Sequence, residues 1–304
     1  MDAKLSIDEY IEQGNLGRHE TFTPRYGWLK KGYDAVIADG NVFKASDAIE
    51  RLGVGKNMVR SIRFWCQAFK LIIDNNGLMV KAPLGEELLE KWDPYLEDIA
   101  SLWLLHWQLF VSPLDAVNWS IAFNKCNLWS FSIKHLTEVL ITNTSQYERL
   151  ARISDKTFGR DASCIIRMYA QESSAKASEI YCPFNQLGLI RQAEQKNMFA
   201  FENNYKYSLP PLIFAAACFS YIAHYVPSGQ NTISLYRLTY DFNSPGVVFK
   251  VPESVTGAYL LAASRILPDM SLVDQIGSTQ LNFEGDPEQL YWKALEKYYE
   301  EKQS

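Results

Sequence analysis

The chain has 304 residues, of which 47% are hydrophobic, 13% aromatic and 21% charged, and its formal net charge is −5. Disordered chains carry too few apolar side chains to offset the entropy lost on ordering, so this composition excludes that class and predicts a globular protein. A chain of this length holds roughly one to three compact units. The net negative charge argues against a protein that coats DNA with its whole surface.

The cysteines and the apolar segments indicate the compartment. The two most apolar segments, 101–111 and 212–226, are shorter than the roughly 20 residues of a membrane span, and both are predicted to be buried helices. The first ten residues, MDAKLSIDEY, have no basic segment followed by an apolar one, so no signal peptide is expected. Five cysteines form no CxxC pair, which predicts neither a disulfide framework nor a zinc site and favours the cytoplasm: Cys66, Cys126, Cys164, Cys182 and Cys218.

Charge is unevenly distributed along the chain. Residues 1–72 contain eleven Lys or Arg against nine Asp or Glu, a local net charge of +2. Residues 84–116 contain one Lys against seven acidic residues, a local −6, and the last twenty-one residues add −3. We therefore expect a polyanion to meet the N-terminal part, with the acidic segments facing away or facing a partner.

The segment 46–81 predicts a helix, a turn, a second helix and a hairpin. Ser46 is expected to cap a short helix that ends at Leu52, and Gly53 and Gly55 permit a sharp turn. After the second helix, KLII, DNNG and LMVKA form two β-prone arms joined at Asn-Gly, the strongest short-range hairpin signal. This order is typical of a winged helix-turn-helix.

The second helix of this unit, from Lys56 to about Phe69, is amphipathic. Its apolar residues recur at steps of three and four: Val59, Ile62, Cys66 and Phe69. Another side carries a cationic flank made of Lys56, Arg60 and Arg63, with Asn57 beside it. We interpret these four residues as a DNA-contacting set, because guanidinium groups bind phosphates in bidentate fashion and a helix N-terminus attracts anions. The alternative is that the flank is the solvated side of a core helix.

Beyond residue 83 the chain is predicted to be mostly helical. A break is expected near Asp93-Pro94, because proline cannot continue the preceding helix. Helices are then predicted at 131–140, 145–153 and 154–170, the last capped by Ser154 and buried through Phe158, Ala162, Ile165 and Tyr169. Outside that buried stripe lies a second candidate set for DNA contact, for which a solvated helix face is an equal alternative: Lys156, Arg160 and Arg167.

The predicted fold class is mainly α with small β-hairpins, in several winged helix-turn-helix-like units packed together. Another hairpin is predicted within residues 198–209, and a helical module ends the chain. The expected domains are a basic segment with a winged helix-turn-helix at 1–83, a helical linker with a second helix-turn-helix-like unit at 84–180, and a winged-helix-like module at 181–304.

The segment HETFTPRYGWLKKGYD, residues 19–34, combines several residue types that nucleic-acid chemistry uses. Arg25, Lys30 and Lys31 are suited to hold a phosphate, and Tyr26 or Trp28 to stack on an unpaired base. His19 and Glu20 are weak candidates for a metal site or for acid and base catalysis of phosphodiester cleavage. The ordinary alternative is that the aromatic residues are core and the basic residues are solvent-facing partners of acids.

Nuclease signatures are missing from the sequence. It has no carboxylate cluster followed by ExK, no His-Asn-His arrangement and no HxD or HKD string, and Glu202 with Lys206 is too weak a pair to assign. Walker, GxGxxG, GxSxG and HExxH motifs are also absent. His106 and His224 lie on apolar helices and are predicted to be core residues. No metal or cofactor site is recognised, and Mg²⁺ or Mn²⁺ is expected only if the protein is a nuclease.

Several strings resemble, in this order, a bacterial family, the domain of unknown function 4007 family (SspB-like). They are HETFTPRYGWLKKGYDAV, the segment 43–70, DPYLEDIASLWLLHWQLF, SDKTFGRD, CPFNQLGLI and SPGVVFKVPE. Together they span nearly the whole chain. Genes of this family lie beside a cysteine desulfurase and a phosphoadenosine-phosphosulfate-reductase-like enzyme in DNA phosphorothioation clusters. The resemblance implies a role in anti-phage defence by sulfur modification, and the Ssp-type member is described as a DNA nickase.

Two functional hypotheses follow from the residues and the resemblance. The first is a cytoplasmic DNA-binding component of a phosphorothioation system that nicks DNA, so that the sulfur-transfer machinery reaches the backbone. The second is a non-catalytic adaptor or regulator whose winged helices bind the sulfur-transfer enzyme. The expected partners are DNA, the cysteine desulfurase and the reductase-like enzyme, and no membrane.

Overall fold

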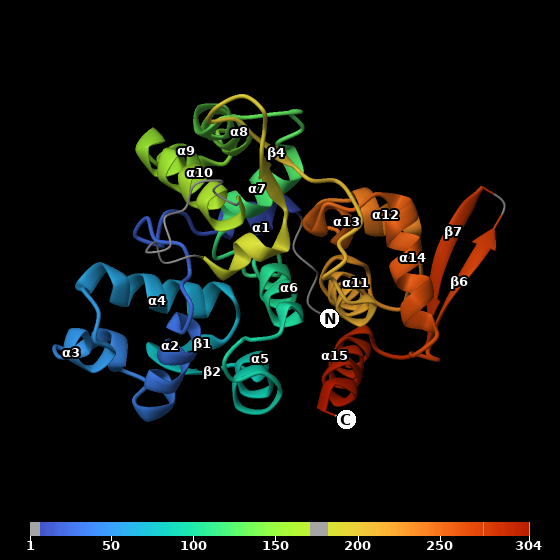
Figure 1. Cartoon of the computed structure of the whole chain (residues 1–304), viewed down its shortest axis with the longest axis horizontal. Helices are drawn as coiled ribbons and strands as arrows, with labels where there is room; N and C mark the ends of the chain where they lie inside the picture. Colours follow the sequence, from blue (N-terminus) through green and yellow to red (C-terminus); the bar gives the residue numbers. More distant parts are fainter. Residues whose placement is uncertain (1–6, 171–181, 276, 304) are drawn as a thin grey trace.

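A buried helix, α6 (Ile99–Gln108), lies near the centre of the protein (Figure 1). The computed structural model describes residues 7–170, 182–275 and 277–303. All side chains of α6 from Ala100 onward are buried, which accounts for the continuous apolar run in the sequence. The helix packs against η3 (Pro183–Leu187), α11 (Pro211–Tyr225) and α13 (Pro245–Phe249). Distant parts of the chain therefore share this one helix as their interior.

From α3 onward, the N-terminal elements follow the predicted order. They are α1 (Ile7–Gln13), α2 (Trp28–Ala38), η1 (Val42–Lys44), α3 (Ala48–Leu52), α4 (Lys56–Ala68), β1 (Ile72–Asn75) and β2 (Leu78–Lys81). Gly53 ends α3 with φ 62°, and Asn76 and Gly77 join the strands with φ values of 52° and 89°. Asp47, not Ser46, occupies the N-cap position of α3. The helix, turn, helix and hairpin are confirmed, while their assignment as a winged helix stays a prediction.

The predicted break at Asp93 is confirmed. α5 (Pro83–Glu86) continues into the π-helical η2 (Glu87–Trp92), and the chain leaves the helix at Asp93. The Asp93 carboxylate accepts hydrogen bonds from the backbone N–H groups of Glu97 and Asp98 and from the Ser101 hydroxyl, at 2.7–3.0 Å. These bonds fix the direction in which α6 starts.

The middle of the chain forms a helical layer on one side of α6. It contains α7 (Val117–Lys125), α8 (Ile133–Thr144), α9 (Glu148–Ala151) and α10 (Asp155–Tyr169). Ser154 stands at the N-cap position of α10 as predicted, although its side chain caps no backbone group. The predicted inner stripe of this helix is buried in full: Phe158, Ala162, Ile165 and Tyr169. Residues 171–180 of the predicted second unit lie outside the described residues.

The hairpin predicted within residues 198–209 is wrong in register. β4 (Phe199–Phe201) pairs with the preceding strand β3 (Ile190–Gln192), not with the residues after it. The chain turns away after β4 because Lys206 is buried and its Nζ donates to the Glu202 carbonyl at 2.6 Å and to Asn204 Oδ1 at 2.7 Å. β4 also forms a bridge to Phe131, before α8.

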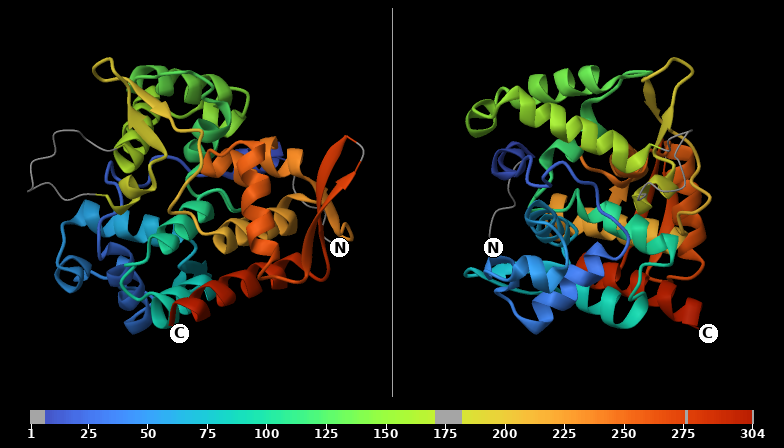
Figure 2. Two further views of the ribbon diagram at one scale, coloured as in Figure 1. Left: turned by 45° about the vertical axis from the view of Figure 1, so that its right-hand side comes forward. Right: turned by 60° about the vertical axis from the view of Figure 1, so that its left-hand side comes forward.

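The C-terminal part combines helices with a three-stranded sheet. Its elements are α11, β5 (Thr232–Ser234), α12 (Leu235–Tyr240), α13, α14 (Glu253–Ser264), β6 (Met270–Gln275), β7 (Ser278–Phe283) and α15 (Pro287–Gln303). The strands are antiparallel in the order β5-β7-β6. Figure 2 shows the long β6–β7 hairpin at one edge of the molecule and α15 running beneath it, packed against α11.

A contiguous hydrophobic core extends from Tyr10 to Tyr299. All five cysteines are buried and free, as expected. Among the described helices, none combines the length and apolarity that crossing a bilayer requires. The three predicted domains therefore share one interior, and their boundaries stay a prediction.

Candidate nucleic-acid interface

The candidate site is organised around Asp161, a buried carboxylate on α10 with 1% exposure. Its Oδ1 lies 2.8 Å from His19 Nε2, and its Oδ2 accepts from Asn118 Nδ2 at 2.8 Å and from the Gly17 N–H at 3.2 Å. These bonds tie the segment before α2 to α10 and α7. Gly17 is required here, because its φ is +69° and a Cβ would lie 2.6 Å from Thr157 Cγ2.

His19 has a structural role, which corrects its prediction as a catalytic or metal-binding residue. The side chain is 1% exposed and its ring lies among Phe64, Trp65 and Trp119. Its Nδ1 accepts the Thr21 N–H at 3.1 Å while Nε2 faces Asp161. Both ring nitrogens are therefore engaged, Nε2 with the Asp161 carboxylate and Nδ1 with the Thr21 N–H.

The next two residues connect α4 with α10. Glu20 and Thr21 adopt φ values of 50° and 68°, which turn the chain sharply after His19. The Glu20 carboxylate lies 3.5 Å from the Arg60 guanidinium on α4. The Thr21 carbonyl accepts a hydrogen bond from Arg167 Nη2 on α10 at 2.5 Å. Two consecutive residues thus hold one arginine from each basic helix.

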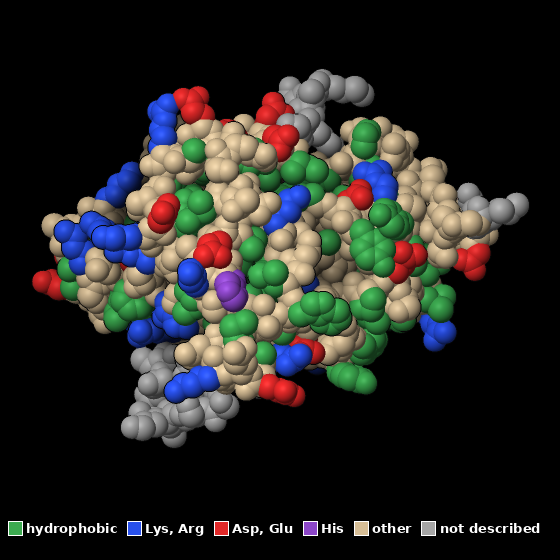
Figure 3. Space-filling model, turned by 90° about the horizontal axis from the view of Figure 1, so that it is seen from above, with side chains coloured by type: hydrophobic (Ala, Val, Ile, Leu, Met, Phe, Trp, Pro, Cys, Tyr) green, Lys and Arg blue, Asp and Glu red, His purple; other side chains and the backbone are tan. Residues whose placement is uncertain are grey.

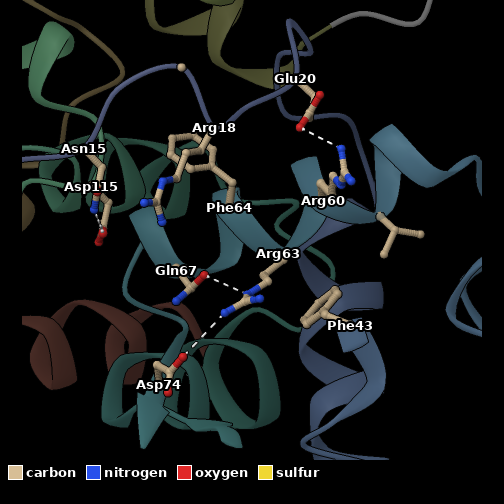
Figure 4. Close-up of a pocket in the computed structure, with 12 residues that line it drawn as sticks. Asn15, Arg18, Glu20, Phe43, Arg60, Arg63, Phe64, Gln67, Asp74 and Asp115 are labelled. Atoms are coloured by element: carbon tan, nitrogen blue, oxygen red, sulfur yellow. Dashed lines mark hydrogen bonds and ion pairs between the residues drawn. The ribbon is translucent and has the colours of Figure 1, made fainter. Parts of the chain in front are cut away.

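A cavity of about 540 Å³ opens between α4 and the segment 15–20; we call it the α4 cavity. Figure 4 shows Arg18, Arg60 and Arg63 directed toward it, and Arg63 lies 3.2 Å from Gln67 Oε1 and 3.5 Å from Asp74. The lining is of mixed charge, because three acidic residues join the three arginines. The lining residues are Asn15, Gly17, Arg18, Glu20, Phe43, Val59, Arg60, Arg63, Phe64, Gln67, Asp74 and Asp115.

A second cavity, of about 340 Å³, lies on α10; we call it the α10 hollow. Its lining consists of Thr21, Lys156, Gly159, Arg160, Ser163 and Arg167. No acidic side chain is among these residues, so the lining carries only positive charge. Figure 3 shows Lys and Arg side chains gathered at the left end of the molecule, the end that holds α4 and α10 in Figure 1. The two cavities lie near each other, because the consecutive residues Glu20 and Thr21 line one each.

The other predicted site residues are placed less favourably. Trp28 is 6% exposed, which corrects its prediction as a base-stacking residue, because a buried indole is not accessible to a base. Arg25 lies over the rings of Trp28 and Phe22, at 5.0 and 5.4 Å from their centroids. Tyr26 is 54% exposed, and its hydroxyl is hydrogen-bonded to Gln186. Of this segment, only Tyr26 keeps an accessible ring.

The lysines of the same segment line neither cavity. Lys30 pairs with Asp34 at 2.6 Å, and Lys31 donates to the Leu52 carbonyl at 3.1 Å. Lys56 and Asn57 are exposed at the first turn of α4, outside the α4 cavity. His106 is confirmed as a core residue: it is fully buried and bonded to the Tyr169 hydroxyl and the Val248 carbonyl.

The lining residues that sequence reasoning missed include Arg18, Gly159 and Ser163. Arg18 is a single basic residue outside any periodic pattern, so the sequence gives no signal for it. Gly159 was recognisable from the sequence. A glycine inside a helix lowers its stability, so its presence often indicates a packing or functional requirement.

Comparisons with known proteins agree with this fold. A crystal structure of SspB superposes with a TM-score of 0.89 and 32% sequence identity, covering 96% of this chain and 90% of that one. A magnesium-ion-bound SspB structure gives 0.88 and 33%, with the same coverage. No curated protein matches the chain significantly. The model of the family described as protein of unknown function (DUF4007) matches residues 16–299, and the chain therefore belongs to the DUF4007 family.

Proposed function

We propose that this protein binds the DNA backbone across α4 and α10 as a component of a bacterial phosphorothioation system. The proposal rests on two contacts: Glu20 pairs with Arg60 of α4, and the Thr21 carbonyl accepts a hydrogen bond from Arg167 of α10. The segment that makes both contacts is held in place by the buried carboxylate of Asp161. The similarity to SspB supports the assignment to this system.

The charges on this surface are available to phosphates. Lys56, Lys156 and Arg160 are exposed and form no ion pair within the described chain. The Arg60 side chain is 55% exposed and its contact with Glu20 is long, so that ion pair stabilises the fold little and is readily exchanged for a phosphate contact. With a net charge of −5 for the whole chain, other surfaces repel DNA and restrict it to this one.

DNA binding is tested by the double variant Arg60→Ala/Arg63→Ala. Each lost phosphate contact is expected to flatten the plot of log affinity against log salt by about 0.9, so two contacts give roughly 1.8, with weaker affinity at low salt. Binding is measured by fluorescence anisotropy with a labelled duplex over a series of NaCl concentrations. Lys297→Ala, at an exposed position of α15, is the matched control and is expected to bind like the unaltered protein. An unchanged affinity and salt slope in the double variant contradict the role of α4.

Magnesium does not fit the described residues. They include no group of three or more His, Cys, Asp or Glu side chains placed to hold a metal ion. The carboxylates of the α4 cavity are already paired, Glu20 with Arg60, Asp74 with Arg63 and Asp115 with Lys70. We therefore derive no metal-dependent step, and strand nicking stays a proposal that rests on the family resemblance.

Nicking and the adaptor role are separated by incubating supercoiled plasmid with the purified protein and Mg²⁺ or Mn²⁺. Conversion to open circles that is lost in Glu20→Gln assigns nicking to the α4 cavity. Intact supercoils, together with binding of the desulfurase or the reductase-like enzyme, assign the adaptor role. Lys134→Ala on α8 serves as the control for purity, because a contaminating nuclease cuts with both variants.

A further inference from the structure

The α10 hollow contains a glycine that the fold does not require. Gly159 lies inside α10 with ordinary helical geometry, where glycine is less stable than alanine. A Cβ built on it meets only Thr137 Oγ1, at 3.9 Å, which is an ordinary contact. Gly32 in α2 differs, because a Cβ there lies 2.6 Å from both Cys66 Sγ and Ile62 Cγ2. Packing explains Gly32, but it does not explain the missing side chain at Gly159.

The groups around Gly159 are donors without acceptors. Lys156, Arg160 and the Ser163 hydroxyl make no hydrogen bond or ion pair within the part of the chain that the structure describes. Arg167 is oriented by the Thr21 carbonyl and keeps donors free, because a guanidinium has five N–H groups. With no acid in the lining, an anion finds three positive charges and a hydroxyl donor around a bare stretch of helix.

We propose that the α10 hollow binds a phosphate group of the nucleic-acid backbone, held close against the helix at Gly159 by Lys156, Arg160 and Arg167. This inference rests on the proposed DNA-binding function and names where the backbone makes its closest approach. A backbone phosphate is favoured over a free one because Thr21 lines this hollow while Glu20 lines the α4 cavity. A polymer can occupy both cavities at once.

The test uses side chains that fill the hollow without harming the helix, Gly159→Ala and Gly159→Leu. Both are strong helix formers, so thermal unfolding followed by circular dichroism is expected at the same temperature or higher. DNA affinity, measured by anisotropy, is expected to fall with side-chain size, by roughly tenfold for leucine, the equivalent of one lost charge-assisted hydrogen bond. Gly257→Ala, at a helix glycine of α14, is the control and is expected to keep full affinity.

Three outcomes overturn the inference in distinguishable ways. If Gly159→Leu binds DNA like the unaltered protein while Arg60→Ala/Arg63→Ala does not, the hollow is not part of the interface and the proposed function stands. If the unaltered protein binds no DNA, the proposed function fails as well. If inorganic phosphate at matched ionic strength raises the unfolding temperature, and Gly159→Leu loses that effect at unchanged DNA affinity, the ligand is a free anion.

Discussion

At the scale of single residues, Asp161 anchors the segment that connects the two basic helices, α4 and α10. Two of its three hydrogen bonds reach residues more than 140 positions away in the chain, and the third reaches Asn118. Asp161→Ala leaves His19, Asn118 and the Gly17 N–H without partners in a buried site, so we expect the free energy of unfolding to fall by about 3–5 kcal/mol. Urea denaturation measures it, with Asp155→Ala, exposed on the same helix, as the control. A decrease in the free energy of unfolding of less than about 1 kcal/mol would show that the hydrogen bonds of Asp161 do not stabilise the fold.

Lys250 makes stability depend on pH. Burial lowers its pKa to about 8, and its Nζ donates to the Phe123 carbonyl at 2.6 Å and lies 4.3 Å from the Phe201 ring centroid. The unfolded chain keeps this amine protonated up to a pKa near 10.5, so between pH 8 and that value the unfolded state binds more protons and stability rises with pH.

The titration of Lys250 is isolated by comparing the protein with Lys250→Met. Between pH 7 and pH 9 we expect the unaltered protein to gain about 1 kcal/mol relative to the variant, measured by urea denaturation at both values. The subtraction cancels the effect of the buried tyrosines and of the buried cysteines other than Cys126, whose charge interacts with that of Lys250. Lys134→Met, with a side chain 83% exposed, is expected to show no such change. If the difference in free energy of unfolding between the two proteins is the same at both pH values, the pKa of Lys250 is not lowered in the folded state.

At the scale of elements, periodic helices and the Asn-Gly hairpin β1–β2 were predictable, whereas the three-residue strands β3 and β4 were not. The apolar stripe of α4 and that of α10 follow from steps of three and four, because a helix with one buried face needs them. β3 and β4 span three residues each, too short for a period of two to be recognised. The β6–β7 hairpin carried a readable signal in its second strand, where Leu281 and Phe283 are buried and alternate with polar residues. This strand was missed because the sequence analysis predicted a helical module for the end of the chain.

The candidate site was only half predictable for a related reason. The cationic residues of α4 and α10 stand out locally, because each set repeats at helical spacing. The turn between them depends on His19 meeting Asp161, a contact between residues far apart in the chain that one sequence does not reveal. Trp28 was assigned to base stacking because residue type alone does not tell an exposed indole from a core one.

At the scale of the whole molecule, the N-terminal unit is completed by the rest of the chain. Trp65 and Phe69 of this unit are fully buried. Trp65 packs edge to face on Trp119, with centroids 5.6 Å apart, and Phe69 stacks on Phe184 at 5.0 Å. Both partners lie outside residues 1–83, so a fragment with those bounds would expose two large aromatic side chains. The α4 surface therefore depends on elements that the sequence assigns to other domains.

This shared interior predicts one cooperative unfolding transition for the whole chain. Urea curves followed by tryptophan fluorescence and by far-ultraviolet circular dichroism are expected to coincide, because Trp65, Trp103, Trp107 and Trp119 lie in one continuous core. Phe184→Ala, in η3 outside residues 1–83, is expected to lower the free energy of unfolding by about 3–5 kcal/mol and to shift both curves together. The variant loses the ring that stacks on Phe69 at the end of α4. Because the core is continuous, this local loss is expected to destabilise the whole chain. A separate early transition in the fluorescence curve, or a folded fragment of residues 1–83, would show instead that the N-terminal unit is an autonomous domain.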